Sequence, residues 1–483
     1  MAKLSSIFTA RDMTKGAPWK RILEFSIPLL IGNIAQQFYN TADSIIVGRY
    51  IGDNALAAVG SAGPILHLLL VLFVGVSTGT GIMVSQYFGA KDREKLSRTI
   101  GVSMTLTVIA SFVVMIVGPL VSRPLLNLLN TPASIIDWCE DYLNIFFLGA
   151  AGFSFYNILS GVLRGLGDSL SALLFLLVST ALNVVLDIWF VAKFNMGVPG
   201  VALATVIAQA FSAVLCFLKL KKMSHLFDIR LKYFKPVKEF TVRLVKLGLP
   251  SGLTQAIFSL AMVTVQSLTN SFGEMIIACN VIVMRVDGFA MMPNFSYGMA
   301  MTTYTGQNVG AGNLDRVKEG MRSGLKLAVS TAAGITAVIL LLGRYLIPIF
   351  TDTVELVDLG MRMMSILAVG YVAMAVTQVL SGIMRGAGDT VTPMWISMIT
   401  TIAIRVPIAY GLAYLTRSSA YPNGRPESIF ISLLIAWISG ALINSFIYAK
   451  GTWRKKALRE FRQKADGMAE NETSDLKPDV GEI

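Results

Sequence analysis

The sequence contains few charged residues, two histidines and three cysteines among its 483 residues. Charged residues make up 14% of the chain, whereas a soluble domain has about 25%. The cysteines stand apart and form no C-x-x-C pair, which argues against a disulfide framework or a cysteine zinc site. With so few histidines and no H-E-x-x-H motif, no hydrolytic or metal-dependent active site is expected. We therefore do not expect an enzyme.

Hydrophobic residues, by contrast, make up 54% of the chain, and the mean hydropathy is +0.64. They form blocks of roughly 20 residues, the length that a helix needs to cross a bilayer. The blocks are too long and too continuously apolar for alternating barrel strands. We expect an all-α integral membrane protein with twelve transmembrane helices, near residues 22–46, 56–84, 100–121, 135–159, 170–192, 199–220, 244–270, 276–305, 322–343, 357–383, 392–415 and 428–449.

Basic residues are distributed unevenly between the predicted loops. Of the 41 Lys and Arg residues, 32 fall on the side of the two termini and 6 on the opposite side. The positive-inside rule then predicts a multi-pass protein of the plasma (inner) membrane with both termini in the cytoplasm. The same bias accounts for the net charge of +12, because the excess meets anionic lipid headgroups. No nucleic-acid partner is expected, and the polar, basic start of the chain does not read as a signal peptide.

The chain repeats itself at an offset of 221 residues. SGVLRGLGDS, which starts at Ser160, matches SGIMRGAGDT, which starts at Ser381, at six of ten positions. At the same offset, SQYFGAKD from Ser85 pairs with GQNVGAGN from Gly306. Each repeat holds six predicted spans, and because six is even both repeats enter the membrane from the same side. The two lobes should therefore be related by pseudo-twofold symmetry along the membrane normal.

This duplication predicts five parts of the chain. They are a cytoplasmic N-terminal segment (1–21), a six-helix lobe (22–220), a basic cytoplasmic linker (221–243), a second six-helix lobe (244–450) and a polar, partly disordered cytoplasmic tail (451–483). Two lobes built from parallel repeats are typical of alternating-access transporters. A passive channel would also fit a duplication. The architecture therefore favours a transporter but does not exclude a channel.

Three aspartates lie inside predicted spans: Asp43, Asp187 and Asp287. A carboxylate at the centre of a lipid-exposed span costs about 2.5–3.5 kcal/mol, so these side chains should face the bundle interior or a wet cavity. Each is either a binding group or a structural hydrogen-bonding group. Arg285 is a possible partner for Asp287.

Asn183 and Asp187 are four residues apart and share one helix face. Their oxygens can hold a proton on Asp187 or a desolvated Na⁺. If Asp43 comes close, the two carboxyl groups would titrate as a coupled pair, and the possible Na⁺ ligands are Asp43, Asn183 and Asp187. Apart from H⁺ or Na⁺ as coupling ion, we expect no cofactor.

Several polar residues are candidates for a substrate cavity. Gln36 and Tyr39 make the first span unusually polar near Asp43. In the second lobe the candidates are Gln255, Asp287, Gln378 and Arg405. Arg405 could instead pair with Asp287 as a structural contact.

Motifs along nearly the whole chain are similar to those of a known family. The stretch ILEFSIPLLIGNIAQQFYNTADSIIVGRYIGDNALAAVG resembles the first-span region of the multidrug and toxic compound extrusion (MATE) family. The resemblance continues through NILSGVLRGLGDS, LNVVLDIWF and GVPGVALATVIAQ, and returns in the second half as GLPSGLTQAIF, DGFAMMPNFSYGMA, GQNVGAG and SGIMRGAGD. It implies an antiporter that exports organic cations or other amphiphiles against an inward H⁺ or Na⁺ gradient. We expect small amphiphilic or cationic substrates, contact with membrane lipids and a functional monomer.

The resemblance also implies a cation site in the first lobe. In archaeal and DinF-like members this site would correspond to Asp43, Asn183, Asp187, Thr205 and Asn157. NorM-type members carry acidic residues in spans seven and ten, where this chain has no carboxylate in the core of either span. The chain is therefore expected to be closer to the DinF-like or archaeal type.

The alternative function is a flippase for lipid-linked precursors, which MATE proteins resemble in fold. A flippase would favour a strongly cationic central cavity. Only Arg285 and Arg405 lie clear of the predicted span ends, and the buried carboxylates outnumber them. Export of amphiphiles is the favoured interpretation.

Overall fold

The computed structural model describes residues 11–349, 351, 353–419 and 421–457. Every regular element within these ranges is a helix, as predicted. The first repeat consists of α2 (Pro18–Tyr50), α3 (Asp53–Gly89), α4 (Arg93–Leu128), α5 (Ile136–Leu148), α6 (Ala150–Gly165), α7 (Ser169–Ile188), its π-helical continuation η2 (Trp189–Lys193) and α8 (Gly197–Lys222). The linker holds one short helix, η3 (Leu231–Tyr233).

The second repeat follows the same order. It consists of α9 (Lys238–Ser271), α10 (Glu274–Gly310), α11 (Leu314–Leu346), the short η4 (Ile347–Ile349), α12 (Val354–Ala368), α13 (Gly370–Gly386), α14 (Val391–Met398), the π-helical η5 (Ile399–Ile404), α15 (Arg405–Leu415) and α16 (Glu427–Lys450). Part of the predicted tail, residues 458–483, and residues 1–10 lie outside the described residues.

The predicted twelve spans are confirmed as twelve helical segments in the described part of the chain. Among the described residues, eight helices are long and apolar enough to cross a membrane, or ten if each of two bent pairs counts as one span. The pairs are α5–α6, bent by 53°, and α12–α13, bent by 40°. The remaining two segments, α2 and α3, are 33 and 37 residues long.

The repeated R-G-x-G-D motif builds the same helix start in both halves. Asp168 caps α7, because its carboxylate accepts from the Ser171 amide at 2.9 Å and from the Ser171 hydroxyl at 2.7 Å. Asp389 accepts from the amide and hydroxyl of Thr392 at 3.1 and 2.7 Å. Each carboxylate also pairs with a lysine, Asp168 with Lys219 at 3.5 Å and Asp389 with Lys456 at 2.6 Å. The aspartates of the motif are thus occupied structurally.

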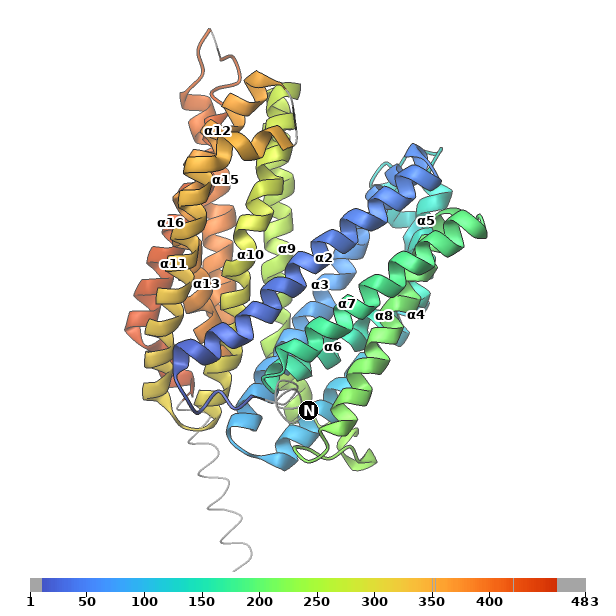
Figure 1. The fold of residues 1–483 in the computed structure, drawn as a ribbon, viewed down its shortest axis with the longest axis vertical. Coiled ribbons are helices and arrows are strands. Elements are labelled where there is room, and N and C mark those ends of the chain that lie inside the picture. Colours follow the sequence, from blue (N-terminus) through green and yellow to red (C-terminus); the bar gives the residue numbers. More distant parts are fainter. Residues whose placement is uncertain (1–10, 350, 352, 420, 458–483) are drawn as a thin grey trace, which may run out of the picture.

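The helices form two bundles, α2–α8 and α9–α16, which meet at one end and separate toward the other (Figure 1). The bundles pack mainly through α3, which runs along α9 and α10. Gly75 and Gly79 allow this approach, because a Cβ on either would lie 2.8 Å from a carbonyl oxygen of Gly248 or Leu244. The helix α2 crosses between the bundles and packs against α7 on one side and α10 and α11 on the other.

The end where the bundles meet, here called the closed end, is also bridged by the N-terminal segment. Met13 is fully buried there. Its amide donates to Gln307 Oε1 at 2.8 Å, and its carbonyl accepts from Asn308 Nδ2 at 3.3 Å. The backbone of Arg11 packs against Gly167 of the first repeat. This segment therefore contacts both repeats.

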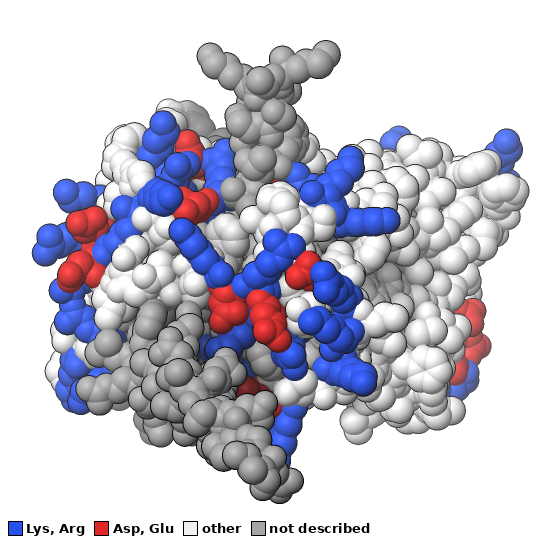
Figure 2. All heavy atoms as spheres, turned by 90° about the horizontal axis from the view of Figure 1, so that it is seen from below, with Lys and Arg blue, Asp and Glu red and all other residues white. Residues whose placement is uncertain are grey.

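Lysine and arginine side chains gather on the closed end (Figure 2). This face carries the start of α9, the end of α8 and the short loops that follow α3 and α10. It is the face that the sequence predicts to be cytoplasmic.

Candidate functional site

Two carboxyl groups meet inside the first bundle. Asp43 of α2 and Asp187 of α7 lie within hydrogen-bonding reach of each other. Asp187 is fully buried, and one oxygen of each group, Oδ1, has no hydrogen-bond partner within the described residues. Two ionised carboxylates in a buried site repel each other, so this arrangement favours a shared proton or a cation between them.

A chain of polar groups leads to this pair. The Tyr39 hydroxyl donates to Thr205 Oγ1 at 3.2 Å. The Asn183 carboxamide satisfies both neighbours when its nitrogen donates to Asp187 Oδ2 at 2.9 Å and its oxygen accepts from the Thr205 hydroxyl and amide at 3.2 Å. The reverse orientation would turn the amide oxygen toward the carboxylate, where it has no donor. Tyr39, Thr205, Asn183 and Asp187 thus form one relay.

These groups provide oxygen ligands of the hard type that alkali and alkaline-earth cations prefer. Within the described ranges no group of three or more His, Cys, Asp and Glu residues could hold a metal ion. The cluster has two carboxylates and otherwise neutral oxygens, which suits a proton or a monovalent cation better than a strongly bound divalent one.

Tyr142 of α5 is buried and near enough to Asp43 and Asp187 to interact with their charge. Sequence reasoning missed it, because nothing in IDWCEDYLNIFFL distinguishes this tyrosine from those that fill helix packing. Its position depends on how α5 packs against α8 and α3.

Asn157, predicted for the cation site, lies elsewhere, and Gln36, predicted for the substrate cavity, lines neither that site nor the cavity between the bundles. Asn157 of α6 donates to the Phe153 carbonyl at 2.9 Å and lines a different cavity. The Gln36 side chain faces Asn40 Oδ1 at 3.5 Å and not the carboxyl pair. The structure therefore brings together Asp43, Asn183, Asp187, Thr205 and Tyr39, without Asn157 or Gln36.

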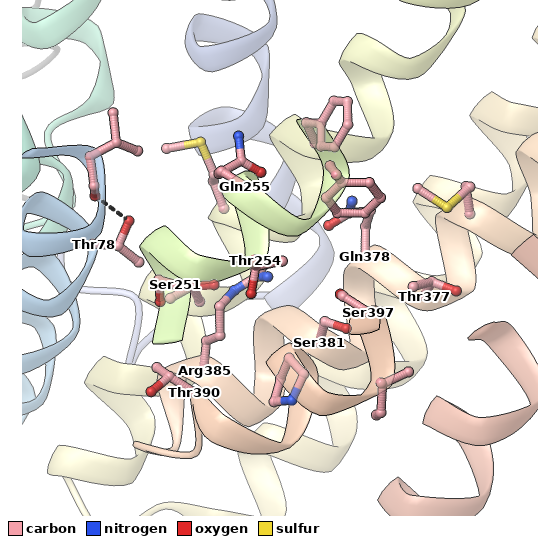
Figure 3. A pocket seen from close by; sticks show the side chains of 18 of the residues that line it. Thr78, Ser251, Thr254, Gln255, Thr377, Gln378, Ser381, Arg385, Thr390 and Ser397 are labelled. Carbon is pink, nitrogen blue, oxygen red and sulfur yellow. Dashed lines mark hydrogen bonds between the residues drawn. The ribbon is translucent and has the colours of Figure 1, made fainter. Parts of the chain in front are cut away.

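A cavity of about 410 Å³ lies between the two bundles. It is lined by α2, α3 and α6 of the first repeat and by α9, α10 and α13–α16 of the second. Of the residues predicted for a substrate cavity, Gln255, Gln378 and Arg405 line this one, whereas Gln36, Tyr39 and Asp287 do not. Figure 3 shows many hydroxyl groups around it, among them those of Ser251 and Thr254.

The charge of this cavity differs from the sequence-based expectation. Its lining contains three arginines, Arg164, Arg385 and Arg405, and no carboxylate among the described residues. The prediction that only Arg285 and Arg405 could contribute, and that carboxylates would outnumber them, is wrong for the cavity; Arg285 is exposed and does not line it. The predicted span boundaries place Arg164 and Arg385 in loops, whereas the structure places them in the last turns of α6 and α13. Helical side chains lean back toward the N-terminus, here toward the cavity.

Asp287 of α10 does not line the cavity. It lies beside Tyr371 and Arg405, but Asp287 Oδ1, the Tyr371 hydroxyl and Arg405 Nε have no hydrogen-bond partner in the described part of the chain. The second bundle therefore has a buried polar group of its own behind the cavity wall. The exposed Arg285 is not its partner.

Comparisons with known proteins cover most of the chain. The family model MatE matches twice, over residues 28–189 and 250–411, once in each repeat. The probable multidrug resistance protein YpnP of Bacillus subtilis (strain 168) is 30% identical over 94% of this chain and 100% of its own length. The probable multidrug resistance protein YoeA of the same organism is 28% identical over 93% of this chain and 97% of its own.

Solved structures share the fold. One, the outward-facing conformation of a multidrug resistance MATE family transporter of the MOP superfamily, superposes with a TM-score of 0.84. It is 25% identical, and the match covers 93% of this chain and 99% of that one.

Proposed function

Because the chain belongs to the MATE family, we propose that this multidrug transporter is a secondary antiporter, which exports amphiphilic compounds while H⁺ or Na⁺ moves inward. Its relatives are named as multidrug resistance proteins, not as enzymes. The observation that carries the coupling proposal is the meeting of Asp43 and Asp187 at the end of the polar relay.

The position of α2 supports a coupling role for this pair. Asp43 is on α2, which packs against α7 in the first bundle and α10 and α11 in the second. A proton or Na⁺ between Asp43 and Asp187 draws α2 and α7 together, and its release lets the two carboxylates repel. Ion binding would thereby change how α2 connects the bundles, which is the movement that alternating access needs.

We assign the basic closed end to the cytoplasm by the positive-inside rule. In this assignment the bundles diverge toward the outside, both described ends of the chain lie on the cytoplasmic side, and the protein works in the plasma membrane as a monomer. The coupling ion enters from the outer side to the first-lobe site, as in the DinF-like or archaeal type. The substrate occupies the cavity between the bundles, where Gln255 and Gln378 provide hydrogen bonds.

The test is transport in proteoliposomes, with a pH gradient and a Na⁺ gradient imposed separately. One of the two gradients should drive substrate movement by the unmodified protein. Asp43→Asn and Asp187→Asn should each remove that gradient dependence while leaving the thermal midpoint of the purified protein within a few degrees. Asp315→Asn, an exposed change at the closed end, is the matched control. Full gradient-driven transport by both first-lobe variants would defeat the proposal.

A further inference from the structure

We infer that the cavity between the bundles binds amphiphiles with a negatively charged head group, a carboxylate, sulfonate or phosphate, and that the three arginines hold this group. This inference rests on the proposed export function and names its substrate class. It replaces the organic cations expected from family resemblance with organic anions.

The first observation is the charge of the lining. Arg164, Arg385 and Arg405 contribute three positive charges, and no acidic residue lines the cavity within the described residues. An organic cation would be repelled there. Buried charges normally require an opposite charge or a full set of hydrogen bonds, and an anionic ligand would provide both.

The second observation is that these arginines have no carboxylate partner within the cavity among the described residues, although Asp287 lies near Arg405 behind the cavity wall. None of them forms an ion pair in the described ranges. Arg164 donates to hydroxyls, those of Ser160 at 3.2 Å and Ser77 at 3.4 Å. Arg405 is 8% exposed, and its Nε has no hydrogen-bond partner.

The repeated motif explains why Arg164 and Arg385 do not pair with the aspartates that follow them. Each R-G-x-G-D motif places an aspartate four residues after its arginine. Asp168 and Asp389 cap the next helix and pair with Lys219 and Lys456. Because Asp168 and Asp389 are engaged in these contacts, they do not pair with Arg164 and Arg385, whose side chains line the cavity.

The third observation is geometric. Arg164 and Arg385 are equivalent in the two repeats, so one guanidinium reaches the cavity from each bundle. In Figure 3 the Arg385 side chain extends from α13 toward Thr254 of α9, among the hydroxyls of Ser251, Ser381 and Thr390. Guanidinium groups bind carboxylate and phosphate oxygens in pairs, and the hydroxyls offer neutral donors to the remaining oxygens.

The rest of the lining suits an apolar tail. Phe258, Phe295, Met292, Met299, Met374 and Trp437 line the cavity beside the polar groups. A volume of about 410 Å³ is within the range of small-molecule sites, roughly 300–1,000 Å³. A small amphiphile, with its acidic head at the arginines, matches both parts of this lining.

The test uses the full-length protein in nanodiscs and two fluorescent probes that share one dansyl-alkyl tail. One probe ends in a carboxylate and the other in a quaternary ammonium. We expect the carboxylate probe to bind at least about 10-fold more tightly. Arg385→Gln and Arg405→Gln should each weaken carboxylate binding about 10-fold or more and leave ammonium binding unchanged or improved. Arg405→Lys, which keeps the charge, should lose less than Arg405→Gln.

Arg285→Gln is the matched control, because Arg285 also lies within a span but does not line the cavity. Equal or tighter binding of the ammonium probe by the unmodified protein would overturn the inference. So would Gln variants that bind the carboxylate probe as the control does. Because the assay measures binding without a gradient, its failure is distinct from a failure of ion coupling.

Two nanodisc compositions separate the sources of the anion. In discs of phosphatidylcholine alone, the carboxylate probe meets no anionic lipid. If added phosphatidylglycerol displaces the probe, the head group that the site accepts is a lipid's. If phosphatidylglycerol leaves probe binding unchanged, the site takes free amphiphiles.

Discussion

Gln86 and Gln307 occupy equivalent positions in the two repeats, and each reaches across the interface to the opposite repeat. Gln86 Nε2 donates to the Gly386 carbonyl at 3.0 Å, and Gln307 Nε2 donates to the Gly165 carbonyl at 3.2 Å. Both glycines directly follow the cavity arginines in the repeated motif. This reciprocal pair of hydrogen bonds holds the closed end, and both bonds have to break before the bundles can separate there.

Removing either glutamine should therefore shift the protein toward opening at the closed end. A net hydrogen bond contributes about 0.5–1.5 kcal/mol, so Gln86→Ala or Gln307→Ala should raise the open population several-fold. The measurement is thiol labelling of a Ser85→Cys reporter, since Ser85 is fully buried at this interface. Gln266→Ala, which removes a hydrogen bond to Asn270 within α9, should not change the labelling rate. A rate in the Gln86→Ala and Gln307→Ala variants equal to that of this control would contradict the role.

The closed end also depends on two glycines at the same crossing. A Cβ on Gly310 would overlap the Gln86 carbonyl, and one on Gly89 would overlap the Gln307 carbonyl. Replacing a helical glycine by alanine ordinarily stabilises a helix. Gly310→Ala should do the opposite, with a cost of about 1–3 kcal/mol from overpacking and a lower thermal midpoint.

The matched change for this prediction is Gly334→Ala, because nothing lies within 4 Å of the added Cβ there. Its thermal midpoint should stay the same or rise. Identical midpoints for the Gly310 and Gly334 variants would show that the bundles do not need this close approach.

Thr205 should be required for its hydroxyl and not for its shape. Thr205→Val keeps the volume but leaves the Asn183 oxygen and the Tyr39 hydroxyl without that partner. A buried group without its partner costs about 1–3 kcal/mol. We expect the H⁺ or Na⁺ concentration at half-maximal transport to rise about 10-fold in Thr205→Val and much less in Thr205→Ser. Equal effects of the two substitutions would separate Thr205 from the relay.

The motif aspartates should affect stability. Asp389→Ala removes the two hydrogen bonds that its carboxylate accepts from Thr392 at the start of α14. Loss of such a cap-type interaction costs about 0.5–2 kcal/mol, whereas Asp389→Asn keeps most of it. Asp168→Ala should lower the thermal midpoint by a similar amount, because its carboxylate accepts the same pair of hydrogen bonds from Ser171. An unchanged thermal midpoint in both alanine variants would contradict this account.

The spans were predictable because bilayer thickness imposes one length on every crossing. The bends were not. The α5–α6 bend occurs at Gly149, where a Cβ would overlap Val206 of α8, so its cause is a contact between distant segments. The π-helical turns η2 and η5 likewise have no local signal that we recognised.

Some features of the candidate site were likewise predictable from the sequence, and others were not. Asn183 and Asp187 share a face because of helical periodicity, which a sequence displays. The approach of Asp43 and Tyr142 depends on how α2 and α5 pack, which it does not. The positions of Arg164 and Arg385 were not predictable, because a difference of a few residues in a helix boundary moves an arginine from a cavity to a loop. In addition, a helical side chain leans toward the N-terminus of its helix, which carries both arginines toward the cavity.

Met13 lies buried where the two repeats meet; its backbone is hydrogen-bonded to the second repeat, and the backbone of Arg11 packs against Gly167 of the first. When the bundles separate at the closed end, the N-terminal segment around Met13 must lose its contacts with at least one of the two repeats. Lys15 is exposed beside it. A dye attached through Lys15→Cys would therefore act as an optical reporter of each turnover, placed outside the route that the cargo follows.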